Sequence, residues 1–261
     1  MKNIITPFLI LLVIFSLCSC ASQNFYQVHK ASPIGGKITK SAVLFENKHC
    51  IVSYDLMNVG GNSGFYFYNK TNDFITIELD KTFFIRNGES FPYFKNRSTT
   101  YSYSRAVSAS MGGVYSNGTS SNPGAIGNQS ASGVETNYPQ MQQMIIPPLT
   151  KMRVEEYVIT EWQYQDCDYN VYPSRKEVET LKFSEEESPL EFSNLITYTS
   201  GAETINYENQ FFVEEITNYP EVEATTLLRK NDCGKTLNTP VRRLRVFGPN
   251  YFYLSYERAF K

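Results

Sequence analysis

FFIRNGESFPY, residues 83–93, has the pattern of a β-hairpin. The pair Asn87-Gly88 at its centre favours a type I′ turn, because both central residues of that turn need a positive φ. Aromatic and branched residues lie before the pair, and Phe91 and Tyr93 continue the apolar pattern after it. The stretch therefore predicts two short antiparallel strands joined by a tight turn.

Alternation of apolar and polar residues extends this pattern to both sides of the hairpin. Residues 51–56 place Val52, Tyr54 and Leu56 on one face, and residues 75–79 alternate in the same way. Further strand-like runs follow, and no stretch has a convincing helical period over ten residues. These runs cover residues 151–162, 190–198, 211–216, 222–228 and 241–256. The sequence predicts an all-β fold, an antiparallel, immunoglobulin-like β-sandwich built as one large or two consecutive sandwiches.

A long polar segment interrupts the strand pattern. Between Arg105 and Glu135 there is no charged residue, and glycine, serine and asparagine dominate. Such composition cannot bury enough apolar surface to order the chain, so we expect a flexible insertion at about residues 98–140. Its role is open between a binding or lid loop and a tolerated surface excursion.

The N-terminus has the layout of a secretory signal peptide. Lys2 precedes an apolar run, residues 8–15, that is too short to cross a bilayer, and Leu17-Cys18-Ser19-Cys20 follows. This tetrapeptide resembles the lipobox of bacterial lipoproteins. The resemblance implies that residues 1–19 are removed and that Cys20 becomes the acylated first residue, with fatty chains such as palmitate holding the protein on a membrane.

This resemblance also sets the expected location and domain order. It implies a lipid-anchored protein of the bacterial cell envelope, and the lack of an acidic residue between Cys20 and Glu46 favours the periplasmic face of the outer membrane. Residues 20–40 have Pro33 and two glycines and little periodicity, which predicts a tether. An N-terminal β-sandwich region at 41–165 and a C-terminal β region at 166–261 would follow.

A second, weaker resemblance comes from two short motifs. Residues 84–88, Phe-x-x-Asn-Gly, and Ile146-Pro147-Pro148 are similar to steps in uncharacterised lipoproteins of Bacteroidetes. That family brings no assigned activity, so it transfers no catalytic residue.

Three cysteines lie after the anchor, Cys50, Cys167 and Cys233. Disulfides persist outside the cytosol, and an odd number allows at most one pair within the chain. Cys167 and Cys233 both lie in polar, turn-like settings and are the favoured pair. Cys50 opens an apolar run, which predicts a buried thiol that acts as a small hydrophobe.

Charge and side-chain chemistry exclude several functions. The formal net charge is -2, and lysine and arginine are scattered, so no nucleic-acid partner is expected. Paired carboxyl groups are the first place to look for hydrolysis, and five acidic residues are grouped here: Glu155, Glu156, Glu161, Asp166 and Asp168. Glu155 and Glu161 share a face but would lie about 20 Å apart on a strand, too far for an acid and base on one glycosidic bond. Only two histidines exist, and a metal contact could involve only His49 with Cys50. We predict no catalytic, cofactor-binding or metal-binding residue.

The expected function is therefore a non-enzymatic binding or structural module at the envelope, with an envelope protein or a glycan as its partner. One alternative is an envelope hydrolase that uses acidic residues brought together by folding. Another is a subunit of a surface assembly that adds a strand to a neighbour.

Overall fold

The computed structural model describes residues 23–96, 98–104, 133–155, 157–231, 233–245 and 247–258. Contacts divide the chain into two compact units, one formed by Met1–Tyr93 with Gln143–Lys261 and the other by Phe94–Gln142. Regular structure is almost entirely β, and the named strands all pair antiparallel. The prediction of an all-β, antiparallel, sandwich-like fold is confirmed.

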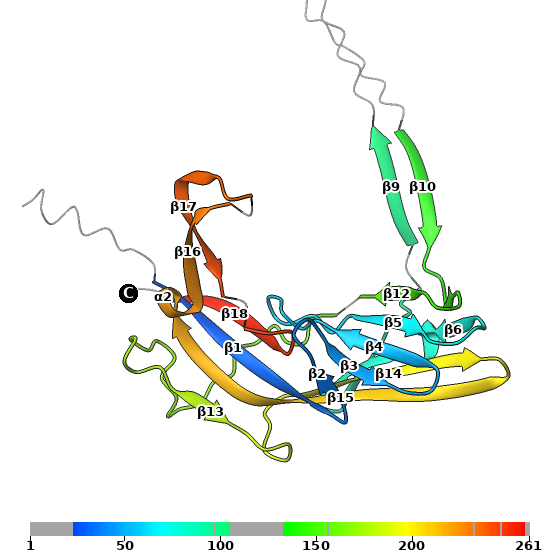
Figure 1. The fold of residues 1–261 in the computed structure, drawn as a ribbon, viewed down its shortest axis with the longest axis horizontal. Helices are drawn as coiled ribbons and strands as arrows, with labels where there is room; N and C mark the ends of the chain where they lie inside the picture. The colour runs from blue at the N-terminus through cyan, green and yellow to red at the C-terminus, as the bar shows by residue number, and fades with distance from the viewer. Residues whose placement is uncertain are drawn as a thin grey trace, which may run out of the picture. The chain divides into compact units, whose positions relative to one another are not determined.

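The larger sheet belongs to the first unit. Its nine strands are β1 (Gln23–Ile34), β6 (Ile75–Glu78), β7 (Phe83–Arg86), β8 (Glu89–Pro92), β11 (Gln143–Ile146), β13 (Thr180–Lys182), β14 (Glu191–Ser200), β15 (Glu203–Pro220) and β18 (Tyr251–Arg258). The main path runs β11-β6-β14-β15-β1-β18, with β7 and β13 attached to β14 and β15. Figure 1 labels the central strands of this path, β14, β15, β1 and β18. The long strand β15 pairs with β14 along its first half and with β1 along its second half.

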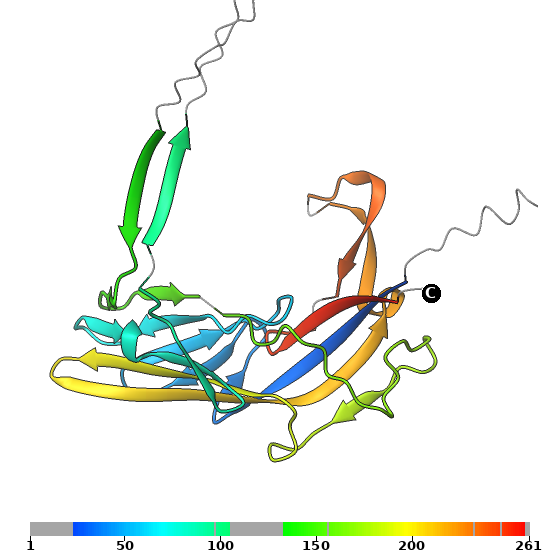
Figure 2. The same ribbon diagram turned by 180° about the vertical axis from the view of Figure 1, so that it is seen from behind.

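The smaller sheet is a meander of neighbouring strands. Its order is β12 (Lys151–Val154), β5 (Phe65–Asn69), β4 (Cys50–Tyr54), β3 (Val43–Glu46) and β2 (Lys37–Ile38). Four strands that follow one another in the chain lie side by side here, unlike the Greek-key order of an immunoglobulin domain. In Figures 1 and 2, β3 and β4 lie beside the β14–β15 hairpin.

The remaining elements are short. They are the 3-10 turn η1 (Leu79–Lys81), the helix α2 (Glu221–Ala224), the ribbon of β16 (Thr225–Lys230) with β17 (Thr236–Leu244), and, in the second unit, the ribbon of β9 (Ser98–Ser104) with β10 (Gly133–Pro139). In the described ranges no helix is long and apolar enough to cross a membrane.

Aromatic side chains join the two sheets of the first unit. Phe211 on β15 lies 5.1 Å from the ring of Tyr54 on β4 and 5.2 Å from that of Phe45 on β3, and it stacks on Phe192 of β14 at 4.9 Å. All four side chains are buried. The apolar residues that alternate with polar ones along these strands thus lie on one face of each sheet, and the two faces form a common core.

The hairpin at residues 83–93 forms as predicted. β7 and β8 pair through Asn87 and Gly88, which have φ values of 46° and 81°. Asn87 also joins the hairpin to the strand β14, because its side-chain oxygen accepts the Glu191 N–H at 2.8 Å and its backbone N–H donates to the Glu191 carbonyl at 2.9 Å. The turn is therefore part of the sheet and not an isolated excursion.

The predicted tether at residues 20–40 is wrong over most of its length. Gln23–Ile34 forms β1, which lies between β15 and β18 in the larger sheet. Its side chains are buried on both faces, with Val28 and Ala31 as well as Gln27 and His29 inside. A strand buried on both faces shows no apolar–polar alternation, which is why the periodicity gave no signal.

The predicted boundary at residue 165 is also wrong. β14, from the C-terminal half, pairs with both β6 and β7 from the N-terminal half, so the two predicted regions share one sheet. The division observed instead separates Phe94–Gln142, a segment that covers the predicted insertion. Its described part pairs as β9 with β10, and residues 105–132 lie outside the described ranges.

Candidate functional site

A pocket of about 340 Å³ opens where the β7–β8 turn meets the loop that follows β12. Its walls also include β1, β15 and the residues just before β14, so strands and loops distant in sequence form it together. The polar and aromatic side chains that give the pocket its chemistry are Arg86, Asn87, Trp162, Gln163, Tyr164 and Gln165. Ligand sites are commonly concave, with a few polar groups set among apolar ones.

Trp162 is an exposed aromatic side chain in the lining of this pocket. It is the only tryptophan of the chain, and 76% of its surface is accessible. The Trp162 N–H donates to the Thr160 hydroxyl at 3.1 Å, and that hydroxyl lies 3.1 Å from the Trp162 carbonyl. A single exposed apolar side chain is common on protein surfaces, but this one has a fixed backbone and lines a pocket. Trp162 therefore offers an aromatic surface to a ligand.

The backbone of the Trp162 loop lies tightly against Gly60 and Gly61. The Thr160 N–H donates to the Gly60 carbonyl at 2.9 Å, and the Ile159 N–H donates to the Gly61 carbonyl at 3.2 Å. Gly60 has a φ of +68°, and a Cβ atom there would lie 2.5 Å from the Thr160 carbonyl oxygen. Only glycine fits both the backbone conformation and the close approach.

Two strand side chains hold the same loop. The Gln27 side chain of β1 is buried, accepts the Tyr164 N–H at 2.7 Å and donates to the Tyr164 carbonyl at 2.9 Å. Arg86, at the end of β7, donates to the Ile159 carbonyl at 3.2 Å. The loop is thus tied to the larger sheet on both sides of Trp162. A binding residue held in this way loses little conformational freedom when a ligand arrives.

His29 lines the inner part of the pocket. Its ring stacks on Phe252 of β18, with 4.7 Å between the centroids and an angle of 2° between the planes. Burial penalises the imidazolium form and lowers the pKa of His29 to about 4. Its Nδ1 atom has no hydrogen-bond partner among the described residues. A neutral histidine with one unsatisfied ring nitrogen can bond a hydroxyl group or a water molecule.

The pocket's chemistry suits a hydroxyl-rich ligand. Amide side chains donate and accept hydrogen bonds without charge, and Arg86 adds donors. None of the described residues that line this pocket is an aspartate or a glutamate. The apolar C–H face of a sugar ring can lie on an indole while its hydroxyls reach the surrounding amides.

The acidic residues considered for hydrolysis have separate structural roles. Glu155 forms a 2.8 Å ion pair with Arg153, and Asp166 accepts the Asp168 N–H at 2.8 Å. Glu161 lines a neighbouring hollow of about 380 Å³, which shares Arg86 with the pocket beside Trp162. Glu156 lies outside the described residues.

The contact considered between His49 and Cys50 has other partners. His49 Nδ1 lies 3.2 Å from the Tyr198 hydroxyl, and its Nε2 lies 3.9 Å from Glu203. Burial raises the pKa of the Cys50 thiol to about 12, and a thiol that stays protonated is a poor metal ligand. Over the ranges that the structure describes, no three His, Cys, Asp or Glu side chains are grouped to hold a metal ion.

The cysteines are placed only partly as predicted. Cys50 is a buried free thiol, as expected. Cys167 and Cys233 are exposed free thiols, so the structure does not contain the favoured disulfide. They lie in different loops, Cys167 between β12 and β13 and Cys233 between β16 and β17. Cys20, the predicted acylation site, lies outside the described residues.

Sequence reasoning missed the pocket. It placed Trp162 at the end of one long strand, whereas β12 ends at Val154 and a loop follows. The available signal was a lone tryptophan in the polar run Thr160-Glu161-Trp162-Gln163, which does not fit a core position. Gln27 and His29 gave no signal, because the pocket brings β1 next to a loop that is distant in the sequence. Gln27 and Tyr164, which are hydrogen-bonded, lie 137 residues apart.

Comparisons with protein-family models, with curated proteins and with solved structures find no match, so the interpretation of this pocket rests on its own geometry.

Proposed function

We propose that the chain is a lipid-anchored, non-enzymatic binding protein of the bacterial cell envelope, and that the pocket beside Trp162 binds a glycan. One observation carries the binding part of this proposal. The only tryptophan is 76% exposed on a rigid loop, beside a pocket lined by amide side chains. That combination of an indole surface and amide groups fits a sugar ring, and the Arg86 guanidinium adds hydrogen-bond donors for its hydroxyls.

The anchoring part rests on Leu17-Cys18-Ser19-Cys20. A diacylated or triacylated cysteine holds a protein on a membrane durably, whereas one fatty chain does so only marginally. Because β1 begins at Gln23, only Ala21 and Ser22 separate the predicted acylation site from the larger sheet. The protein would then be held close to the membrane surface.

A glycan is favoured over a protein partner by the size and polarity of the site. Protein interfaces of standard size bury about 800 Å² on each partner around a central apolar cluster. Here a single exposed aromatic side chain lies beside a small pocket with Asn87, Gln163 and Gln165. Such a site can hold one or two sugar units.

The pocket gives no support to the hydrolase alternative. Glycoside hydrolysis uses two carboxyl groups that flank the scissile bond. The described lining of the Trp162 pocket has no carboxyl group, and the neutral His29 is buried beneath it. These side chains therefore support binding without hydrolysis.

The test is a binding screen with the acylated full-length protein, extracted from its own membranes. Immobilised peptidoglycan fragments, lipopolysaccharide sugars and capsular polysaccharide serve as probes. We expect one glycan class to retain the protein and Trp162→Ala to weaken retention by roughly thirtyfold, the loss of about 2 kcal/mol typical of a central aromatic contact. Phe74→Ala is the matched control, because Phe74 is 61% exposed and does not line the pocket.

Three results would contradict the proposal. Equal retention of the wild type and Trp162→Ala would show that the glycan binds elsewhere on the protein. Retention by none of the glycans would exclude a glycan as the ligand. Copurification of a stoichiometric envelope protein, lost when Trp162 is replaced, would assign the pocket to a protein partner. Acylation is read separately, from the mass of the N-terminal peptide and its loss in Cys20→Ala.

A further inference from the structure

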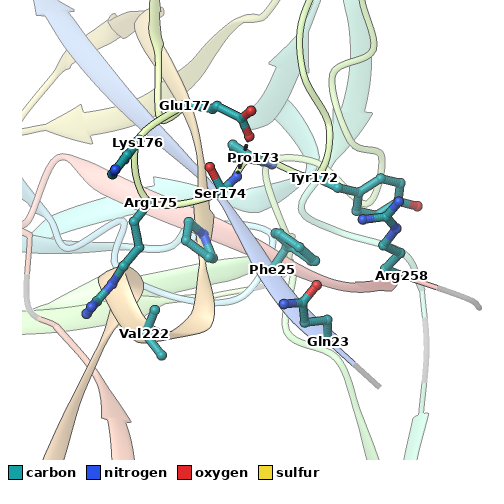
Figure 3. Close-up of a pocket in the computed structure, with 11 residues that line it drawn as sticks. Gln23, Phe25, Tyr172, Pro173, Ser174, Arg175, Lys176, Glu177, Val222 and Arg258 are labelled. Atoms are coloured by element: carbon teal, nitrogen blue, oxygen red, sulfur yellow. Dashed lines mark hydrogen bonds between the residues drawn. The ribbon is translucent and has the colours of Figure 1, made fainter. Parts of the chain in front are cut away.

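A second pocket, of about 590 Å³, lies at the end of the larger sheet where β1 starts and β18 ends. Gln23 and Phe25 of β1, Arg258 of β18 and the loop 172–177 surround it, and Val222 of α2 closes one side (Figure 3). It shares no lining residue with the Trp162 pocket. The two pockets are therefore separate sites.

Cationic side chains dominate the charged lining of this second pocket. Arg175, Lys176 and Arg258 line it, against the single carboxylate of Glu177. Glu177 is engaged by the Ser174 N–H at 2.9 Å, drawn as a dashed line in Figure 3. Glu223, which does not line the pocket, pairs with Arg175, so three cations face two carboxylates. The remaining positive charge makes the pocket suitable for an anion.

Neighbouring groups hold two of the three cations, Arg175 and Arg258. The Arg175 Nε atom lies 2.8 Å from Glu223, and the Arg258 guanidinium lies 5.4 Å from the centre of the Tyr172 ring. Figure 3 shows the Arg258 side chain beside that ring. An arginine fixed in this way presents a planar group of N–H donors, which matches the oxygens of a phosphate.

The rim of the pocket combines charge with apolar surface. Tyr172 and Val222 are exposed by 38% and 37%, and Pro173 and Pro220 also line the hollow. Tyrosine is favoured at membrane interfaces, where its ring is apolar and its hydroxyl is wet. A soluble anion would gain nothing from this surface, whereas a lipid headgroup would bring acyl chains to it.

The position of the pocket in the chain points to the same ligand. Gln23, which lines it, is three residues after Cys20. Three residues span at most about 11 Å, even when fully extended. If Cys20 is acylated, the pocket is therefore held at the level of the headgroups of the same membrane.

We propose that this pocket binds the phosphate of an anionic lipid headgroup, and that it sets the orientation of the protein on the membrane that holds its anchor. The inference rests on the proposed acylation of Cys20. Arg175, Lys176 and Arg258 contact the phosphate, while Tyr172 and Val222 meet the upper acyl region. The anchor supplies attachment, and the pocket supplies orientation.

The experiment uses the acylated full-length protein in vesicles of neutral phosphatidylcholine, or of phosphatidylcholine with 30% phosphatidylglycerol. Amide hydrogen exchange is followed in peptides that cover residues 172–177 and 251–258. We expect exchange in these two peptides to be roughly fivefold slower in the anionic vesicles. This factor corresponds to the gain in the binding constant that one basic residue contributes near an anionic bilayer. The variant Arg175→Gln/Lys176→Gln/Arg258→Gln should exchange at the same rate in both vesicles.

A matched variant, Arg229→Gln/Lys230→Gln/Lys235→Gln on the β16–β17 ribbon, removes the same charge away from the pocket and should keep the difference. Inorganic phosphate at 10 mM with neutral vesicles separates the sources of phosphate. Slower exchange with inorganic phosphate and neutral vesicles would show that the pocket binds the free anion. That result would overturn the proposal that it binds a lipid headgroup.

The failure of the two proposals can be told apart. Acylated Cys20 with equal exchange in both vesicles would overturn the headgroup site and leave the anchor. An unmodified Cys20 would overturn the anchor. In that case, flotation of the protein with anionic vesicles only, abolished by the pocket variant, would still support the headgroup site.

Discussion

Phe211→Ala should be among the most destabilising substitutions in this protein, because Phe211 joins the two sheets. Its side chain is 1% exposed and meets Phe45 and Tyr54 of the smaller sheet and Phe192 of the larger one, with ring centroids 4.9 to 5.2 Å away. Replacing a buried phenylalanine by alanine removes the transfer free energy of the ring and leaves a cavity, at a cost of about 3–5 kcal/mol. In a domain of this size each kcal/mol lowers Tm by roughly 2–4 °C. The expected fall is therefore about 6–20 °C.

Thermal unfolding followed by far-UV circular dichroism measures this effect. Phe74→Ala is the control, since its side chain is exposed and should change the free energy of unfolding by less than about 0.5 kcal/mol. Phe211→Leu keeps most of the volume and should cost clearly less than Phe211→Ala. A loss below about 1 kcal/mol for Phe211→Ala, or equal effects at Phe74 and Phe211, would refute the packing of the two sheets through this residue.

Three further predictions concern the backbone, a histidine and a thiol. Gly60→Ala should lower stability by about 1–2 kcal/mol and weaken glycan binding, because its φ is +68° and its Cβ would clash with the Thr160 carbonyl; denaturant unfolding and the glycan screen measure both. Burial lowers the pKa of His29 to about 4, so as the pH falls from about 6.5 towards 4 the unfolded chain takes up a proton that the folded protein does not, and stability should fall by up to roughly 3 kcal/mol. Unfolding of His29→Phe across that range should lack this part of the pH dependence, and an unchanged profile would contradict it. Without reductant, a maleimide should label both exposed cysteines of the native protein and leave Cys50 unlabelled until it unfolds, because burial raises the pKa of Cys50 to about 12; labelling of neither exposed thiol would show that they pair after all.

The parts of the fold predicted correctly are those that depend on neighbouring residues. The turn at Asn87-Gly88 and the buried face of β4 follow from local conformation and from alternation over a few positions. β1 was missed, because burial on both faces removes alternation and because Gln27 and His29 are polar residues with buried positions. The predicted boundary at residue 165 was wrong because pairings between strands distant in the sequence set the strand order, and local patterns do not reveal those pairings.

The candidate site could not be predicted for the same physical reason. Its loop is fixed by Gln27, Gly60 and Arg86, which are far from Trp162 in the sequence. A lone tryptophan in a polar run indicates an exposed position, but it does not indicate what lies beside it. The second pocket likewise forms only when the start of β1 meets the end of β18.

The proposal that a glycan binds beside Trp162 has a direct optical test, because Trp162 is the only tryptophan of the chain and lines this pocket. The fluorescence of Trp162 is recorded while the glycan retained in the screen is added to the full-length protein. We predict a saturable blue shift of the emission as the sugar displaces water from the indole, with the same midpoint in Phe74→Ala. An emission spectrum that stays unchanged while the glycan demonstrably binds would show that the ligand lies elsewhere, and would contradict the claim.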